Sequence, residues 1–318
     1  MEQILQAEKE NNWFYVSTAQ SLVNLRLHAR EIDHLVPFWF GVTEQGTLVD
    51  QSQPEAIQIA HENNLPILAI IHNFADPQMG ELIHELLTNR ALRQRLIDSI
   101  ENMMANRNFA GVNIDFEFIP PSDRDELNAF MEGLYRRLSP RFKVTISVPA
   151  KLSDAPEHPF SGAFDYRTLA IFSDQLFVLA YDEHFSVPGP VASIGFVRRV
   201  LNYAVTVIPR PKIKLGMAVY GYDWEVSGGM PRSLTYREAV ELARQHGATI
   251  VYDQQAQEPT FTYAANGSRH IIWFENAHSF SAKLDLIFEY GLGGIAVWRL
   301  GQEDPRIWIV IRNRLKPR

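Results

Sequence analysis

Eight short apolar runs alternate along the chain with segments of helical periodicity, and this alternation limits the folds open to it. The runs cover residues 13–19, 34–42, 65–74, 109–118, 142–150, 174–183, 212–224 and 293–301. Helical patterns cover 21–30, 54–63, 78–106 with a break near Asn89, 121–138, 191–207, 281–290 and a short segment from Pro305. Eight such runs, separated in most cases by a helical pattern, predict parallel strands with helical crossovers in a closed (β/α)8 TIM barrel of the α/β class. An open doubly wound sheet is the alternative, which the absence of GxGxxG after the first run disfavours.

One interval breaks this alternation. Residues 225–280 hold a helical pattern at 235–246 and three strand-like runs, TIVYD, PTFTYA and RHIIWFE; AANGS between the last two is typical of a hairpin turn. We expect residues 1–224 and 281–318 to form the barrel. We expect residues 225–280 to form a small α+β lobe, inserted between strand 7 and helix 7 at the C-terminal face, where it flanks a cleft.

The run FAGVNIDFEF, residues 109–118, alternates apolar and polar side chains. On a β-strand the apolar side chains at 112, 114, 116 and 118 pack under helices, whereas Asn113, Asp115 and Glu117 point to the other face. Buried polar groups are costly unless partnered, so three in a row indicate a functional site. An edge strand with one solvated face is the alternative. The Pro-Pro pair that follows favours a central strand that ends sharply.

The position of these carboxylates suggests acid–base chemistry. Barrel enzymes carry their chemistry at the C-terminal ends of the strands, and Glu117 lies at such an end, two residues after Asp115. Neighbouring buried carboxylates raise one another's pKa. Glu117, held protonated near neutral pH, is therefore a candidate general acid, and an ionised Asp115 could orient a substrate group. After this strand, Ser122 as N-cap and Glu126 near capping-box spacing predict a capped helix at 121–138.

The composition excludes several classes of partner and cofactor. A net charge of −7 disfavours nucleic acid and anionic membranes, which need basic patches. Cysteine is absent, and His72, His158 and His184 show neither HxH nor HExxH spacing, so we expect no metal and no other cofactor. The N-terminal sequence MEQILQAEKENN lacks the features of a signal peptide, and no apolar stretch is long enough to span a membrane.

The segment GVNIDFE is similar to the DGxDxDxE signature of the family 18 glycoside hydrolases, the chitinase-type (β/α)8 barrels. This resemblance implies that Glu117 is the catalytic acid and Asp115 the middle aspartate, with Asn113 in place of an aspartate beside the substrate. LAYDEH resembles the family's MxYD motif. That match implies that Tyr181 takes part in catalysis and that Asp182 binds substrate.

Aromatic residues near other strand ends are further candidates for substrate binding. Trp298 matches the tryptophan that forms the floor of the sugar site in the family, although it could instead be a core residue. Tyr220 and Tyr222 lie near the end of the seventh run. On the second run, alternate side chains face opposite sides, so only one of the two sets can face the cleft; Phe40 is a candidate from that run.

Within the family, the resemblance is closest to the spore-cortex-lytic N-acetylglucosaminidases, through GVNIDFEFIPPSDRDELNAFM, FWFGV and FTYAANGSRHIIWFENAHSFSAKLDLIFEYGLGGIAVWRLG. It implies a monomer that cleaves β-1,4 bonds at N-acetylglucosamine in peptidoglycan, of spore cortex or its fragments, by substrate-assisted retention. It also implies a spore-associated, wall-associated or extracellular location, although the chain shows no LysM repeats. A chitinase, an endo-β-N-acetylglucosaminidase and an inactive chitinase-like lectin are the alternatives. IIHNF in place of the SxGG motif disfavours a standard processive chitinase.

Overall fold

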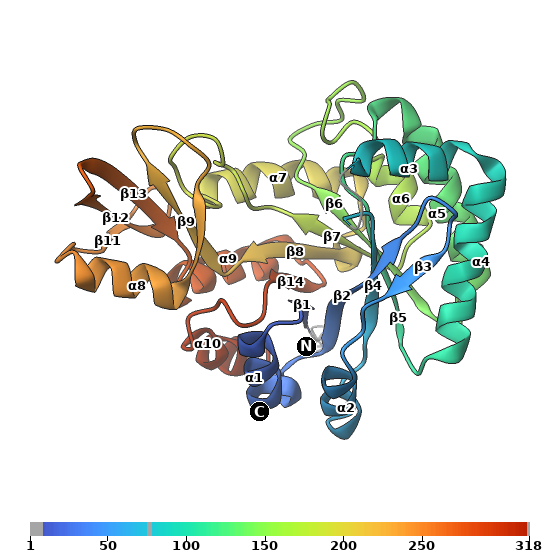
Figure 1. Ribbon diagram of the computed structural model, residues 1–318, viewed down its shortest axis with the longest axis horizontal. Helices are drawn as coiled ribbons and strands as arrows, with labels where there is room; N and C mark the ends of the chain where they lie inside the picture. The colour runs from blue at the N-terminus through green and yellow to red at the C-terminus, as the bar shows by residue number, and fades with distance from the viewer. Residues whose placement is uncertain (1–8, 75–77, 317–318) are drawn as a thin grey trace, which may run out of the picture.

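The computed structural model describes residues 9–74 and 78–316, and Figure 1 shows their arrangement. The parallel strands of the main sheet are β1 (Glu10–Tyr15), β2 (His34–Val42), β4 (Leu68–His72), β5 (Gly111–Asp115), β6 (Lys143–Pro149), β7 (Gln175–Leu179), β8 (Ile213–Ala218) and β14 (Gly294–Trp298). They follow the order β1-β14-β8-β7-β6-β5-β4-β2, and β1 also pairs with β2, which closes the sheet. The prediction of a (β/α)8 barrel is confirmed.

Helices surround this barrel. They are α1 (Ala19–His28), α2 (Pro54–Glu62), α3 (Met79–Thr88), α4 (Arg90–Asn106), α5 (Arg124–Leu138), α6 (Tyr166–Ile171), α7 (Ile194–Val207), α9 (Ala277–Tyr290) and α10 (Ile307–Arg314), with short 3₁₀ turns at η1 (Ala29–Glu31), η2 (Pro121–Asp123) and η3 (Arg210–Lys212). The predicted break near Asn89 is confirmed. The Asn89 side chain caps α4 by accepting hydrogen bonds from the N–H groups of Ala91 and Leu92.

The strands place alternate side chains inside and outside the barrel. The inner cluster contains Phe14, Val36, Leu68, Ile70, Phe177 and Ala296, all essentially inaccessible to solvent. The residues on either side of them in the same strands belong to the larger core that packs against the helices. The barrel is therefore filled by side chains, and a cavity can form only at its ends.

The inserted segment forms a second sheet with one helix beside the barrel (Figure 1). Its antiparallel strands are β9 (Tyr220–Glu225), β10 (Arg232–Thr235), β11 (Val251–Asp253), β12 (Glu258–Ala265) and β13 (Ser268–Phe274), and its helix is α8 (Tyr236–Gln245). The predicted hairpin joins β12 to β13, with positive φ at Asn266 and Gly267 as its turn requires. The single run expected at 212–224 is two strands, so the second sheet takes in residues from Tyr220 onward.

Three local details differ from the expectations. Ser122 lies in the 3₁₀ turn η2, and α5 begins without a side-chain cap, so the predicted capping box is wrong. A short strand, β3 (Leu48–Asp50), pairs antiparallel with the end of β2. Helix α6 was not expected from the sequence, because its six residues are too few to show a helical period.

A buried ion cluster joins the second sheet to the barrel. Lys283 of α9 contacts Glu258 of β12 at 3.0 Å and also pairs with Glu275, and all three side chains are essentially inaccessible. Burial lowers the pKa of Lys283, but the two carboxylates raise it by more, so the ammonium stays charged. Glu258 also accepts hydrogen bonds from the N–H groups of Val191 and Ala192, ahead of α7. This cluster therefore fixes the lobe to the loop that follows β7.

Replacing Lys283 with methionine should lower the free energy of unfolding by about 3–5 kcal/mol, because Glu258 and Glu275 would stay buried without their cation. Urea unfolding of the variant and the wild type measures the change. Arg244→Met is the matched control, since it removes the exposed partner of Glu241 on α8 and should leave stability unchanged. Equal effects of the two substitutions would contradict a structural role for the buried cluster.

Candidate functional site

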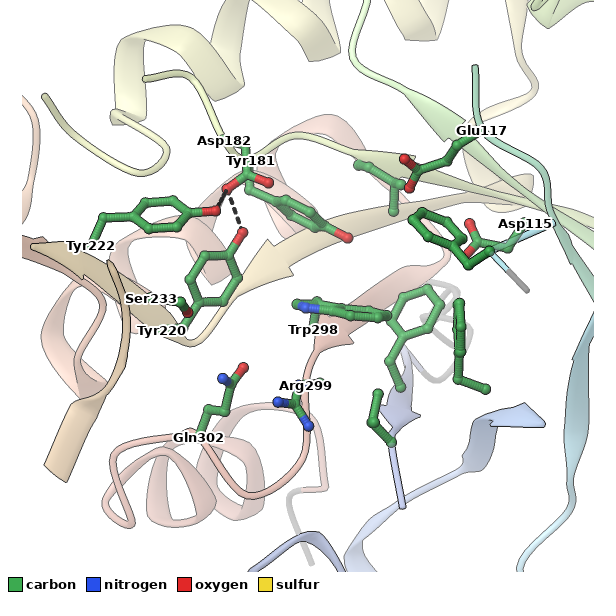
Figure 2. A pocket seen from close by; sticks show the side chains of 15 residues that line it. Asp115, Glu117, Tyr181, Asp182, Tyr220, Tyr222, Ser233, Trp298, Arg299 and Gln302 are labelled. Carbon is green, nitrogen blue, oxygen red and sulfur yellow. Dashed lines mark hydrogen bonds between the residues drawn. The ribbon is translucent and has the colours of Figure 1, made fainter. Parts of the chain in front are cut away.

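A cavity of about 540 Å³ lies at the C-terminal ends of the barrel strands (Figure 2). It is lined by Phe14, Val16, Phe38, Phe74, Asp115, Glu117, Leu179, Tyr181, Asp182, Tyr220, Tyr222, Ser233, Trp298, Arg299 and Gln302. A second cavity of about 710 Å³ shares Asp115, Glu117, Leu179, Tyr181 and Asp182 with it and continues past Ser147, Phe160 and Phe185. The two cavities therefore meet at the carboxylates and form one groove.

Glu117 is held in place by a side chain that the sequence analysis did not single out. Strand β5 ends at Asp115, three residues earlier than expected. The Asn73 side-chain amide accepts a hydrogen bond from the Glu117 N–H at 2.9 Å and donates one to the Glu117 carbonyl oxygen at 2.8 Å. Beyond this clamp Phe118 has a positive φ and is half exposed, so the expected alternation fails there. The sequence signal for Asn73 was a polar residue at the end of an apolar run.

Burial and mutual repulsion disfavour the charged forms of both carboxylates. Burial raises the pKa of Glu117, and the negative charges of Asp115 and Asp182 raise it further. Burial also raises the pKa of Asp115, and a hydrogen bond from Ser147 offsets part of that rise. Among residues 9–74 and 78–316, no cation opposes these effects at either group. Glu117 therefore holds its proton to higher pH than an ordinary glutamate.

Asn113 lies deeper in the barrel than the cavity and does not line it, although it was expected to contact substrate. It is fully buried; its amide donates to Thr145 Oγ1 at 3.0 Å and its oxygen accepts from Ser147 Oγ at 2.9 Å. Ser147 lies next to both Asn113 and Asp115, and its single hydroxyl proton serves one of these two acceptors at a time. The sequence carried a signal for these hydrogen-bond partners, because Thr145 and Ser147 alternate with apolar residues on their strand as Asn113 and Asp115 do on theirs.

Asp182 is fixed by two tyrosines from the second sheet. Its Oδ1 accepts hydrogen bonds from Tyr220 Oη at 2.5 Å and Tyr222 Oη at 2.9 Å, which Figure 2 shows as dashed lines. Burial raises the pKa of Asp182, and the two hydroxyl groups counteract it. Its neighbour Tyr181 points its hydroxyl toward the space between Asp115 and Trp298. The cavity is thus lined by all four residues expected from the MxYD motif and the seventh run: Tyr181, Asp182, Tyr220 and Tyr222.

Trp298, the last residue of β14, forms part of the cavity floor together with two phenylalanines that the sequence analysis did not select. Its ring centroid lies 5.3 Å from that of Phe14 and 6.2 Å from that of Phe38. Phe38 in turn stacks on His72 at 3.8 Å. Burial lowers the pKa of His72 to about 4, so this histidine is neutral at physiological pH and supports the floor as an aromatic ring.

The expectation for Phe40 is corrected by its position. Phe40 is 1% exposed, packs against Phe109 in the outer core and does not line the cavity. The register between β2 and β4 shifts between Phe38 and Phe40, so Trp39 and Phe40 both lie in the outer core. On a regular strand Phe38 and Phe40 would face the same side. The bulge between them turns Phe40 toward the outer core and leaves Phe38 at the cleft.

Within residues 9–74 and 78–316, no group of three potential ligands is placed to hold a metal ion. No helix in the same ranges is long and apolar enough to cross a membrane. The groove presents to a ligand carboxylates, tyrosine hydroxyls, aromatic rings, the guanidinium of Arg299 and the amide of Gln302. Such a set suits a sugar, whose ring stacks on aromatics and whose substituents form hydrogen bonds.

Residues 11–303 match the model of the glycosyl hydrolases family 18. The chain belongs to this family. As a family 18 protein with the carboxylate groove described above, it is a glycosidase.

The chain is similar to several named members of this family. The chain is 33% identical over 306 residues to the cortical fragment-lytic enzyme of Bacillus subtilis, covering 92% of this chain and 70% of that protein. It is also 33% identical over 272 residues to the putative sporulation-specific glycosylase YdhD of Bacillus subtilis, covering 83% of this chain but only 64% of the relative. The crystal structure of a chitinase from Chromobacterium violaceum aligns with a TM-score of 0.90 and 29% identity, covering 98% of this chain and all of that one.

Replacing Asp182 with asparagine should lower the pKa of Glu117, because it removes one of the two negative charges that raise it. Titration of the ¹³C-labelled carboxyl groups by NMR, with the Glu117 signal assigned through Glu117→Gln, measures the shift. Asp125→Asn makes the same chemical change on an exposed turn of α5 and should leave that pKa unchanged. An unaltered Glu117 pKa in Asp182→Asn would show that burial alone sets it.

Proposed function

We propose that this family 18 glycosidase cleaves β-1,4 bonds at N-acetylglucosamine residues of peptidoglycan by substrate-assisted, retaining catalysis. The observation that carries the proposal is the set of carboxylates along the groove. Glu117 and Asp115 are available to substrate, whereas Asp182 is engaged by Tyr220 and Tyr222. We assign Glu117 as the acid and Asp115 to the orientation of the substrate's 2-acetamido group, which itself acts as the nucleophile, as in the substrate-assisted exceptions to the two-carboxylate scheme.

Each step follows from a side chain at the cavity. Glu117, protonated because of its raised pKa, donates its proton to the glycosidic oxygen as that bond breaks. The acetamido oxygen attacks the anomeric carbon and forms an oxazolinium ion. Asp115 accepts the acetamido N–H and balances the positive charge, and Tyr181 donates to the acetamido oxygen. Glu117, now a carboxylate, takes a proton from a water molecule whose oxygen attacks the anomeric carbon. The bond from that carbon to the acetamido oxygen breaks, which restores the acetamido group, the original configuration and the acid.

The groove extends on both sides of the reacting carboxylates, which supports a polymeric or oligomeric substrate. Trp298 forms the floor of one cavity, and Phe160 and Phe185 line the other. Aromatic faces of this kind bind sugar rings by apolar contact. The curated relatives named as cortical fragment-lytic and sporulation-specific favour peptidoglycan of the spore cortex, or its fragments, as the substrate. The enzyme acts on this glycan as a monomer, in association with the spore or wall.

A chitinase is the second candidate, favoured by the likeness to the Chromobacterium violaceum chitinase over the full length of that chain. Digestion of spore cortex, vegetative wall and chitin in parallel, with mass analysis of the products, separates the two. A chitinase releases N-acetylglucosamine oligomers from chitin faster than it cuts cortex. A chitinase-like lectin is disfavoured because Glu117 is present, is partly buried in the groove and has its backbone held by Asn73.

Glu117→Gln should keep glycan binding and lower kcat by about 10²-fold or more, because the amide cannot donate the proton. Initial rates on cortex fragments, with binding measured by calorimetry, test this. Glu157→Gln, on an exposed loop outside both cavities, is the matched control and should turn over normally. Turnover of Glu117→Gln within a few-fold of wild type would place the acid elsewhere.

Substrate assistance requires the acetamido group, so an aryl glycoside of an N-acetylglucosamine oligomer should be hydrolysed with retention while the matching glucoside is inert. Initial rates on the two glycosides, and NMR of the first anomer released, provide the measurement. Comparable rates on the glucoside, or an inverted anomer, would require a nucleophile or base from the protein and would refute the proposed mechanism.

A further inference from the structure

The loop after β14 places two polar side chains at the end of the catalytic cavity. Arg299 follows Trp298 directly, and Gln302 comes three residues later. Both line the 540 Å³ cavity, and both also line a separate cavity of about 790 Å³ between α1, α8 and the loop itself. In Figure 2 they lie on the far side of Trp298 from Asp115 and Glu117. They therefore mark the point where the groove continues away from the reacting carboxylates.

The guanidinium of Arg299 has no hydrogen-bond or ion-pair partner among residues 9–74 and 78–316. Arg306 in the same loop, by contrast, binds Asp304 at 2.7 Å and Tyr236 at 2.9 Å. Arg299 is also partly buried, which lowers its pKa, although an arginine remains charged at neutral pH. A cation removed from water without a partner is unfavourable, so its position is best explained by an anionic ligand.

Gln302 provides a second polar group beside this charge. Its Oε1 is buried and has no hydrogen-bond partner among the described residues, while its backbone oxygen accepts from the Tyr236 N–H at 3.0 Å. The backbone contact fixes the residue and leaves its amide free. An amide beside a guanidinium can complete the binding of a carboxylate or of a carboxamide.

The charges along the cavity separate an anionic group from the catalytic carboxylates. Among the fifteen residues that line the cavity, Arg299 is the one cation. Asp115, Glu117 and Asp182 lie beyond Trp298 and repel a further negative charge. A substrate with a carboxylate thus has one favourable orientation, with that group at Arg299.

We propose that Arg299 and Gln302 form a subsite for a carboxylate on the residue next to the acetamido sugar that binds over Trp298. This inference rests on the proposed function. In peptidoglycan every second sugar carries a 3-O-lactyl group, whose carboxylate is either free or amide-linked to a peptide with carboxylates of its own. Chitin has no such group. The 790 Å³ cavity beside Arg299 provides the space into which the substituent extends.

The test compares wild type with Arg299→Met on two oligosaccharides of equal length, one of N-acetylglucosamine alone and one in which N-acetylglucosamine alternates with N-acetylmuramic acid whose lactyl carboxylate is free. The ratio of kcat/KM for the charged over the neutral oligosaccharide should fall about tenfold or more in the variant, mainly through KM, as for loss of a charge-assisted hydrogen bond. Arg299→Lys keeps the charge without the planar fork and should recover part of the ratio. An unchanged ratio in both variants overturns the inference.

Two further comparisons test whether the effect is specific to Arg299 and which carboxylate is bound. Arg237→Met removes an exposed charge on α8 beside the same 790 Å³ cavity, and an equal loss there would mean general attraction in place of a subsite. An oligosaccharide with its lactyl group amidated should lose its sensitivity to Arg299→Met if the lactyl carboxylate is bound. If a fragment with a peptide on that amide remains sensitive, the bound group is a peptide carboxylate.

Failure of this inference can be told apart from failure of the proposed function. The dissociation constants of the same oligosaccharides, measured by calorimetry, give the ratio for Arg299→Met even where nothing is cleaved. Absence of cleavage by the wild type refutes the proposed function, and the binding ratio still decides the subsite. Cleavage of both oligosaccharides with an unchanged ratio refutes the subsite alone.

Discussion

Closure of the parallel sheet is the constraint on which the rest of the molecule depends. Because β1 pairs with both β14 and β2, the C-terminal ends of the strands surround one space. That closure brings Asp115, Tyr181 and Trp298 together, although they lie far apart in the sequence. The apolar cluster inside the barrel fills the interior below them, so these polar side chains lie above it, at the C-terminal end of the strands. The catalytic groove is therefore a consequence of the barrel.

The same burial that would be costly for stability is useful for catalysis. Carboxylates held out of water without a cation bind protons more tightly, and this raises the pKa of Glu117, the residue that we propose as the general acid. Neutral hydrogen-bonding groups limit the cost. Asn73 holds the backbone at Glu117, and the Ser147 hydroxyl lies beside both Asp115 and Asn113. Because these partners are neutral, they position the carboxylates without cancelling the rise in pKa that the proposed acid requires.

The second sheet contributes to the site as well as flanking it. Tyr220 and Tyr222 of β9 hold Asp182, so the barrel loop and the inserted lobe must keep a fixed relation. The buried contacts of Lys283 with Glu258 and Glu275 maintain that relation, and Glu258 extends it to the loop after β7. The loop after β14 completes the groove with Arg299, the residue that distinguishes an anionic glycan from a neutral one.

Local sequence determined the elements that follow from side-chain period and turn chemistry. These are the eight parallel strands, the helices between them other than α6, the polar face of β5, the helix break at Asn89 and the hairpin at Asn266 and Gly267. Tertiary structure decided the features that depend on pairing between distant strands. These are the bulge in β2 that exchanges Phe40 for Phe38, the end of β5 at Asp115, the Asn73 clamp, and the assignment of Tyr220 and Tyr222 to a second sheet. A strand's period is set by its own residues, whereas its register, its bulges and its end are set by the neighbour with which it shares hydrogen bonds.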